Sequence, residues 1–277
     1  MLCKVMEQNH LNLDIRIAID GPNDVTTRED QDAFLNWLEL QRTEVEIIRN
    51  KVNLGLKRQI LSTLNSISSK YDGFIVLEED LVISNFLIEE FYRRLEFFKN
   101  EGRIWSINAY TNSEMRNSTD FLTSYVTSWG WATWSDRWLK IDTDADHIIS
   151  SVKSWSKFNF GNAYDYKLQL YWNKFKIRET WAVFWYATIY INGGSVLQIG
   201  TNHIENNGFN SGENFSKGDS TFYASIDQYA DTFEELPVHR SEDLAMNMFT
   251  ILNKNWKFKL WRTYQWIKLI WKARRLQ

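Results

Sequence analysis

The sequence predicts an α/β protein whose mostly parallel sheet is flanked by helices. Two observations carry this prediction. Strand-like and helix-like segments alternate three times in the first hundred residues, and polar clusters follow the strands at their carboxyl ends. A chain of 277 residues with 44% hydrophobic residues is long enough to bury the core of one large domain or two small ones.

The alternating segments are defined by the spacing of their apolar residues. Short runs rich in Ile and Val predict strands, and apolar residues at a spacing near 3.6 predict helices. The residues between them, such as the run Asp-Gly-Pro-Asn at 20–23, are turn formers. In chain order we expect strands at 13–19, 45–48 and 74–77, each followed by a helix, with helical stripes over 34–40, 56–67 and 86–98.

Beyond an apolar run at 104–107 the alternation fades and the chain becomes rich in tryptophan. Helices are predicted over 164–175 and around 183–191, followed by a sharp turn at Gly193 and Gly194. Residues 201–220 are rich in Asn, Gly and Ser and predict a long loop, which in a compact domain is usually functional or disordered.

Composition narrows the function classes. A net charge of −3 provides no basic field for nucleic acid, so we expect no nucleic-acid partner. The single Cys3 excludes an intramolecular disulfide framework and fits a reducing compartment. No run reaches the roughly 18 apolar residues of a membrane span, and no signal peptide is visible at the N-terminus. The expected location is the cytoplasm, with peripheral contact to the inner face of the membrane as a further expectation.

The acidic triplet Glu78, Glu79 and Asp80 directly follows the third predicted strand. Three adjacent carboxylates repel one another and are costly to desolvate, and a divalent cation such as Mg²⁺ or Mn²⁺ relieves both effects. The alternative is that these acids stabilise the N-terminus of the following helix. The position at a strand end favours a ligand site, because α/β sheets bind ligands beyond the carboxyl ends of their strands.

A block at 128–138 holds four tryptophans. Trp131, Trp134 and Trp138 are spaced i, i+3 and i+7, which predicts one helical face buried in the core. Trp129 and Trp131 are also candidates to cover a sugar ring, and Gly130 allows the backbone to pass close to a ligand. Further along the chain, Glu179 is either a catalytic acid or an ordinary surface acid, and His203 is either a metal ligand or a structural histidine.

Taken in order, several segments resemble a bacterial branch of the GT-A-fold glycosyltransferases that is related to the N-acetylglucosaminyltransferase I group. Each segment alone is weak, and the Trp-Gly-Trp-Ala-Thr-Trp run is the most distinctive. The resemblance runs from about residue 5 to about residue 215 and rests on residues 20–23, 53–56, 75–81, 129–138, 180–188 and 206–209.

The resemblance implies a metal-dependent enzyme, inverting in its stereochemistry. It would move a sugar from a nucleotide-diphosphate donor, expected to be a UDP-sugar, to a glycan or lipid-linked acceptor in surface polysaccharide biosynthesis. Residues 1–110 would form the nucleotide-sugar-binding half, 111–220 the acceptor-side half, and 221–277 a C-terminal helical extension. The residues implied to contact the donor are Asp20, Asn53, Glu78, Glu79 and Asp80. Those implied to contact the acceptor are Trp129, Gly130, Trp131 and Asn207. The residues implied to bind Mn²⁺ or Mg²⁺ are Asp80 and His203.

Three departures from the family pattern bear on activity. The family's acidic motif usually reads Glu-Asp-Asp, so Glu79 stands where an Asp is usual. The chain begins inside what resembles the family's first helix, so the resemblance implies that the strand before it is absent. Some relatives carry an Asp after the Thr-Trp pair, where this chain has Ala182, which leaves Glu179 and Asp136 as candidates for the general base.

Two other function classes remain open. The first is a carbohydrate- or nucleotide-binding protein that is catalytically impaired. The second is another nucleotide-using enzyme, such as a nucleotidyltransferase. The sequence favours the second class less, because it has no Gly-rich phosphate loop followed by Lys. The tail from residue 256 to 275 alternates aromatic and basic residues. It predicts a helix that either lies on a membrane surface or docks on the protein.

Overall fold

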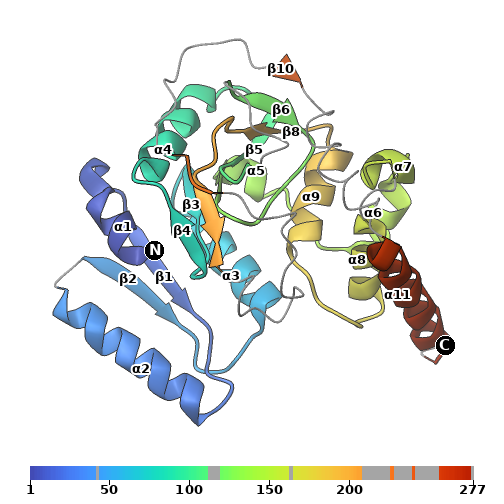
Figure 1. Ribbon diagram of the computed structural model, residues 1–277, viewed down its shortest axis with the longest axis horizontal. Helices are drawn as coiled ribbons and strands as arrows, with labels where there is room; N and C mark the ends of the chain where they lie inside the picture. Colours follow the sequence, from blue (N-terminus) through green and yellow to red (C-terminus); the bar gives the residue numbers. More distant parts are fainter. Residues whose placement is uncertain are drawn as a thin grey trace.

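A computed structural model describes residues 1–41, 44–111, 119–161, 165–207, 225–227, 239–240 and 256–275. Its described part is a mixed α/β structure, which confirms the predicted class. A central sheet lies between an N-terminal βαβ unit on one side and a C-terminal helix on the other (Figure 1).

The N-terminal unit follows the sequence prediction closely. The strands β1 (Ile15–Ile19) and β2 (Val45–Arg49) pair in parallel, with Ile15 opposite Val45, and α2 (Val25–Leu40) connects them. Asp24 caps α2 by accepting a hydrogen bond from the Thr27 amide. Before β1 the chain forms α1 (Leu2–Glu7) and the 3-10 turn η1 (Asn9–Leu11), and after β2 it forms α3 (Leu56–Ser68).

The central sheet has six strands in the order β10-β6-β8-β5-β7-β3. The pairs β5–β8 and β10–β6 are parallel, whereas β3–β7, β5–β7 and β6–β8 are antiparallel. The sheet is therefore mixed rather than mostly parallel. Its strands are β3 (Gly73–Val76), β5 (Ile104–Asn108), β6 (Phe121–Thr123), β7 (Trp131–Trp134), β8 (Ser195–Gln198) and β10 (His239–Arg240).

The mixed sheet arises because β7 enters between β3 and β5 and runs against both. The sequence prediction placed Trp131, Trp134 and Trp138 on one helical face, and this is wrong. Successive side chains of a strand point to opposite faces, so Trp131 joins one hydrophobic core and Trp134 the other. Only Trp138 lies in a helix, the four-residue α5 (Ser135–Trp138).

Helices cover the two cores. The helix α4 (Leu87–Phe98) packs on one face of the sheet with Phe91, while α9 (Ala182–Ile191) is buried on the other. The helix α9 is apolar nearly all round, as expected for a helix enclosed by other elements. The remaining helices on that side are α6 (Ala145–Ser151), α7 (Trp155–Phe158) and α8 (Tyr166–Lys174).

Helices were predicted over 86–98, 164–175 and 183–191, and α4, α8 and α9 confirm them within the described residues. The turn at Gly193 and Gly194 is also confirmed, with Gly193 at φ +66°. The tail forms α11 (Trp256–Arg275), which lies against α8. None of the helices in the described ranges combines the length and the apolar character needed to cross a bilayer.

A third, two-stranded sheet pairs β4 (Leu81–Ile83) with β9 (Ile204–Asn206) in antiparallel orientation. The sequence predicted neither strand, because β4 has three residues and β9 lies within the segment expected to be a loop. The remainder of that predicted loop, from 208 to 220, lies outside the described residues. This small sheet matters for function because β4 directly follows the acidic triplet.

Candidate functional site

The acidic triplet lies in the turn between β3 and β4. The Leu81 amide donates a hydrogen bond of 3.3 Å to the Glu78 carbonyl, which closes the turn. The helix α4 begins only at Leu87, and its first-turn acids are Glu89 and Glu90. The alternative in which the triplet stabilises a helix N-terminus is therefore wrong. The prediction that the triplet ends a strand is confirmed.

Burial and neighbouring negative charges disfavour the ionised forms of Glu78 and Asp80 in this turn. Burial, with the neighbouring charges of Asp80 and Glu79, raises the pKa of Glu78 to about 8. Burial and the charge of Glu79 likewise raise the pKa of Asp80. The Asp80 Oδ1 atom is buried and has no hydrogen-bond partner among the described residues. Glu79 is exposed. A positive charge beside Glu78 and Asp80 would stabilise both carboxylates.

The backbone on one side of the turn comes from the tryptophan block. Val76 pairs with Trp131, so the antiparallel register brings Gly130 and Trp129 toward the turn. A Cβ atom on Gly130 would lie 2.6 Å from Cδ1 of Ile204, and φ at Gly130 is +66°, so only glycine fits without strain. The half-buried Trp129 ring meets the Tyr110 ring edge-to-face, with 4.7 Å between their centroids.

The other side of the turn is formed by β9. Leu81 pairs with Asn206, and the Asn207 amide donates a hydrogen bond of 3.0 Å to the Asp80 carbonyl. The Asn206 side chain also hydrogen-bonds the Asp80 carboxylate. The structure thus brings Asp80 together with Asn207, two residues that the sequence analysis assigned to the donor and acceptor sides. Their roles in binding stay predictions.

Sequence reasoning missed Tyr110 at this site, and it expected Asn206 only as part of a loop on the acceptor side, not as a hydrogen-bond partner of Asp80. No local signal could have found Tyr110, because its contact with Trp129 depends on β5 and β7 being neighbours. Asn206 belonged to the predicted loop.

The described residues hold no group of three or more His, Cys, Asp or Glu side chains arranged to bind a metal ion. Two neighbouring carboxylates are nevertheless compatible with Mg²⁺-type sites, which commonly use one or two carboxylates and complete their shell with water and substrate phosphates. Glu78 and Asp80 fit such a partial site, because each is held at a raised pKa and one oxygen of Asp80 is buried without a partner.

His203 lies at the other end of the small sheet. Its carbonyl accepts a hydrogen bond from the Ser84 amide, whereas Asp80 precedes the first residue of β4. Its Nδ1 lies 2.7 Å from Ser84 Oγ and its Nε2 lies 3.0 Å from Thr201 Oγ1. Burial, reinforced by the charge of Arg94, lowers the pKa of His203 to about 4. The structure does not bring His203 to Asp80, and hydroxyl groups engage both ring nitrogens, so this arrangement does not support the predicted metal role.

Asp20 and Asn53 join the loops that follow β1 and β2. Asp20 Oδ1 accepts from the Leu54 amide at 2.9 Å, and Oδ2 accepts from the Gly55 amide at 2.8 Å. Burial alone would raise the pKa of Asp20, but these bonds and those from Gly21 and Asn50 outweigh it and lower the pKa. Asn53 Nδ2 donates to the Gly21 carbonyl at 2.9 Å. Both side chains hold the loops in place, and their contact with a donor stays a prediction.

The two candidate bases occupy different places. Asp136 is exposed and lies in the first turn of α5, where the Ser135 amide donates to the carbonyl of Asp72, just before β3. Asp136 therefore lies at the opposite end of β3 from the acidic turn, which is the wrong end for a base acting beside Asp80. Glu179 is exposed and lies near Lys57, where its charge counteracts the burial that lowers the pKa of Lys57.

Trp131 is fully buried, with 0% of its surface exposed. It stacks on Trp181 with ring centroids 5.7 Å apart and lies 5.7 Å from Trp138 and 6.0 Å from Trp185. The ring cannot contact an acceptor in this structure, so the predicted acceptor role of Trp131 is corrected to a core role. The half-buried Trp129 remains the accessible ring of the pair.

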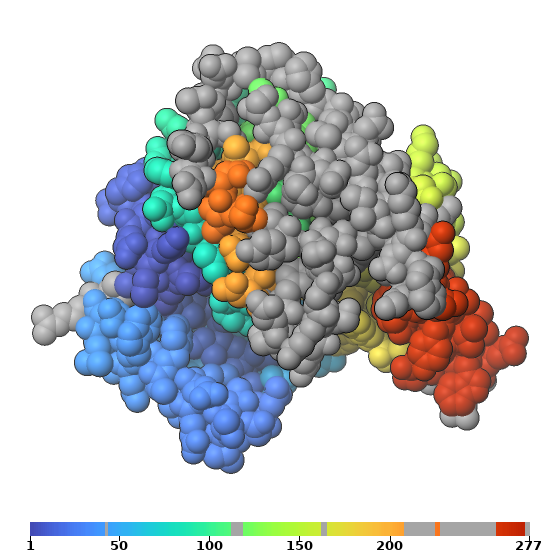
Figure 2. Space-filling view, in the orientation of Figure 1, coloured from blue at the N-terminus to red at the C-terminus, as the bar shows by residue number. Residues whose placement is uncertain are grey.

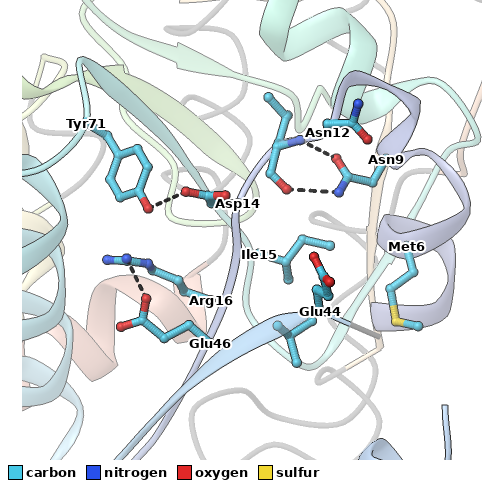
Figure 3. A pocket seen from close by; sticks show the side chains of 11 residues that line it. Met6, Asn9, Asn12, Asp14, Ile15, Arg16, Glu44, Glu46 and Tyr71 are labelled. Carbon is cyan, nitrogen blue, oxygen red and sulfur yellow. Dashed lines mark hydrogen bonds and ion pairs between the residues drawn. The ribbon is translucent and has the colours of Figure 1, made fainter. Parts of the chain in front are cut away.

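A cavity of about 560 Å³ lies at the beginning of β1, at the end away from Asp20. Tyr71 and Asp14 hydrogen-bond across it at 2.5 Å, and Arg16 pairs with Glu46 at 2.5 Å (Figure 3). Arg16 Nε is nevertheless buried without a hydrogen-bond partner among the described residues. The cavity contains none of the residues predicted to bind ligands. The other lining residues are Met6, Asn9, Asn12, Leu13, Ile15, Glu44 and Val45.

A buried network of ion pairs connects α4 with the segment that leads into β9. The sequence analysis did not predict this network. Arg94 of α4 is 1% exposed and pairs with Glu90 and, at 2.6 Å, with Asp120. Asp120 also accepts a hydrogen bond from the Gly200 amide, which lies on the segment leading into β9. The i, i+4 spacing of Glu90 and Arg94 was the available sequence signal. The network fixes α4 against the segment that carries β9.

Searches of known protein-family models and of curated proteins found no match to this chain.

Replacing Glu78 by glutamine is expected to stabilise the metal-free protein at alkaline pH. Folded Glu78 holds its proton up to a pKa of about 8, whereas an ordinary Glu loses it near 4.5. Stability is therefore lost as the pH rises from 4.5 toward 8, and Glu78→Gln removes that loss. We expect the variant to exceed the wild type by roughly 1–3 kcal/mol at pH 8.

Urea denaturation in the presence of a chelator measures the difference. Near pH 4.5 the two proteins should be equally stable, because both side chains are then uncharged. Titrating groups that do not interact with Glu78 are the same in the two proteins, so their pH effects cancel in the comparison. A variant that is no more stable than the wild type at pH 8 would contradict the raised pKa that we assign to Glu78.

Proposed function

We propose that this protein is a nucleotide-sugar-dependent glycosyltransferase whose donor site is the turn holding Glu78 and Asp80. The observation that carries the proposal is the buried, unpartnered Oδ1 of Asp80, in a turn flanked by Trp129 and Asn207. The succession β1, α2, β2, α3, β3 followed by an acidic turn supports a GT-A-type core. The ordered sequence motifs support the same reading.

Glu78 and Asp80 would hold Mn²⁺ or Mg²⁺ in this account, with Glu79 as a solvent-facing neighbour. When bound, the ion would neutralise the charge that develops on the departing diphosphate. The chain's own residues do the positioning. Gly130 lets the Ile204 side chain of β9 pack directly against the backbone beside the turn, and the Asn207 amide fixes the Asp80 carbonyl.

The acceptor side would be formed by Trp129 and the segment that begins at Asn207. A partly exposed indole ring offers a flat surface for the apolar face of a sugar, and the Tyr110 ring contacts it edge-to-face. The donor is proposed to be a UDP-sugar and the acceptor a glycan or a lipid-linked glycan. Inversion of configuration rests on the family resemblance alone. Of the two acids considered as the general base, we retain Glu179.

A thermal-shift screen of nucleotide sugars with and without Mn²⁺ tests the proposal. The wild type should be stabilised by one donor class only when Mn²⁺ is present, and Asp80→Ala should lose that stabilisation. With an acceptor glycan or water, the same donor should slowly release nucleoside diphosphate. A donor- and metal-dependent shift that survives in Asp80→Ala would refute the assigned role.

A sugar- or nucleotide-binding protein without turnover is the second candidate. The observation that favours it is the position of Asp136 at the far end of β3, which leaves no predicted base confirmed beside the acidic turn. The same screen separates the classes. A binding protein shows the metal-dependent shift without any release of nucleoside diphosphate. A nucleotidyltransferase releases pyrophosphate only when it is supplied with a nucleoside triphosphate and a sugar 1-phosphate, which a separate assay provides.

A further inference from the structure

The C-terminal helix α11 has two apolar faces, and the described residues bury only one of them. On the inner face, Leu269 is 3% exposed and packs with Leu168 and Trp172 of α8. Trp266 packs against the same cluster, and its Nε1 donates a hydrogen bond of 2.6 Å to Asp165. The sequence left open whether this helix docks on the protein or lies on a membrane surface. The inner face shows that the helix docks on the protein.

The outer face carries a second apolar stripe. Leu260, Tyr264, Ile267 and Trp271 are spaced i, i+4, i+7 and i+11, which places them on one side of a helix. They are 60%, 59%, 60% and 52% exposed, respectively. At 100° per residue this stripe lies opposite Leu269, and Figure 2 shows α11 in red at the margin of the molecule. Docking on α8 therefore leaves Leu260, Tyr264 and Ile267 exposed on the side of the helix that faces away from α8.

The charges of α11 are all of one sign. Its sequence contains no Asp or Glu, and its charged residues are Lys or Arg. Helical geometry places Lys268 and Lys272 on one flank of the outer stripe and Lys259 and Arg274 on the other. The net charge of the whole chain is −3, so the basic character of this helix is local. Apolar residues between cationic flanks are the pattern of a helix that lies in a membrane interface.

We propose that the outer stripe of α11 seats this protein on the surface of a membrane rich in anionic lipid, while the inner face stays docked on α8. The stripe would enter the head-group region, with Trp271 and Tyr264 at the boundary where such rings are favoured. The flanking lysines and arginines would face the lipid phosphates. A second copy of the chain fits the surface less well, because two copies meeting through this stripe would bring like charges together.

This inference is independent of the proposed function, since α11 carries none of the donor-site residues. Its test uses co-sedimentation of the full chain with vesicles of phosphatidylcholine alone and of phosphatidylcholine mixed with phosphatidylglycerol. We expect at least about tenfold stronger partitioning to the anionic vesicles, weakening as salt is added.

A matched pair of variants locates the contact. Ile267 and Leu139 are both 60% exposed, the first on the outer stripe and the second just after α5. Ile267→Glu should lower the partition coefficient by about tenfold or more, and Leu139→Glu should leave it unchanged. Circular-dichroism melting curves establish that both variants remain folded.

Three results would overturn the proposal. The first is equal binding to neutral and anionic vesicles. The second is Ile267→Glu binding as well as the wild type. The third is sedimentation of the free protein as a dimer that Ile267→Glu dissociates, because the stripe would then be an interface between copies.

Discussion

Replacing Arg94 by methionine is expected to lower the free energy of unfolding by about 3–5 kcal/mol. The guanidinium is 1% exposed and pairs with Glu90, which is 2% exposed, and with Asp120, which is 13% exposed. Methionine keeps much of the apolar stem but leaves the buried Glu90 and the partly buried Asp120 without this counter-charge. Urea denaturation followed by tryptophan fluorescence measures the loss.

The neighbouring residue of the same helix provides the control. Arg93 pairs with Glu89 at 3.7 Å and is 51% exposed, so its ion pair is screened by solvent. Arg93→Met should change the free energy of unfolding by less than about 1 kcal/mol. If Arg94→Met were no more damaging than Arg93→Met, the buried network would not be the support that we assign to it.

Replacing Trp131 by alanine is expected to cost a similar amount, about 3–5 kcal/mol. The ring is completely buried among Trp138, Trp181 and Trp185, so its removal leaves a cavity that rigid neighbours cannot fill. The loss should register in both thermal and urea denaturation.

Trp129, two residues earlier, is the matched comparison. Its ring is only half-buried and meets Tyr110 at one edge. Trp129→Ala should lose less than half of the stability that Trp131→Ala loses, while removing sugar-dependent stabilisation at the proposed acceptor side. The reverse order of stabilities would show that the two rings have been assigned to the wrong roles.

The first half of the fold was predictable because its signals are local. From β1 to α4, the spacing of apolar residues within each segment predicts a strand or a helix. The exception is β4, which is too short to show a period. The acidic triplet could be placed for the same reason. A buried strand precedes it, and the turn comes where the apolar run ends.

The pairing of strands could not be predicted in this way. The spacing of Trp131, Trp134 and Trp138 fits a helix, yet a four-residue strand followed by a short helix buries the same three rings. Because both faces of β7 are buried, Trp131 lies in the core, and the antiparallel direction of the strand carries Asp136 away from the acidic turn. The structure therefore supports neither of these two site predictions.

The structure does not bring His203 to Asp80, for a related reason. Its distance from Asp80 depends on β4 and β9 pairing antiparallel, with Leu81 opposite Asn206 and Ile83 opposite Ile204. That register places Asn207 beside Asp80 and leaves His203 beside Ser84. Neither strand has a sequence signal strong enough to fix the register.

Direct measurement of Mn²⁺ binding in the presence of UDP tests the central claim, that Glu78 and Asp80 form the charged centre of a donor site. Electron paramagnetic resonance of Mn²⁺ reports the free ion, and Asp136→Asn serves as the control because Asp136 is an exposed acid at the far end of β3. We expect Asp80→Asn to weaken Mn²⁺–UDP binding by about tenfold or more and Asp136→Asn to leave it unchanged. Equal binding by the wild type and Asp80→Asn would contradict the account.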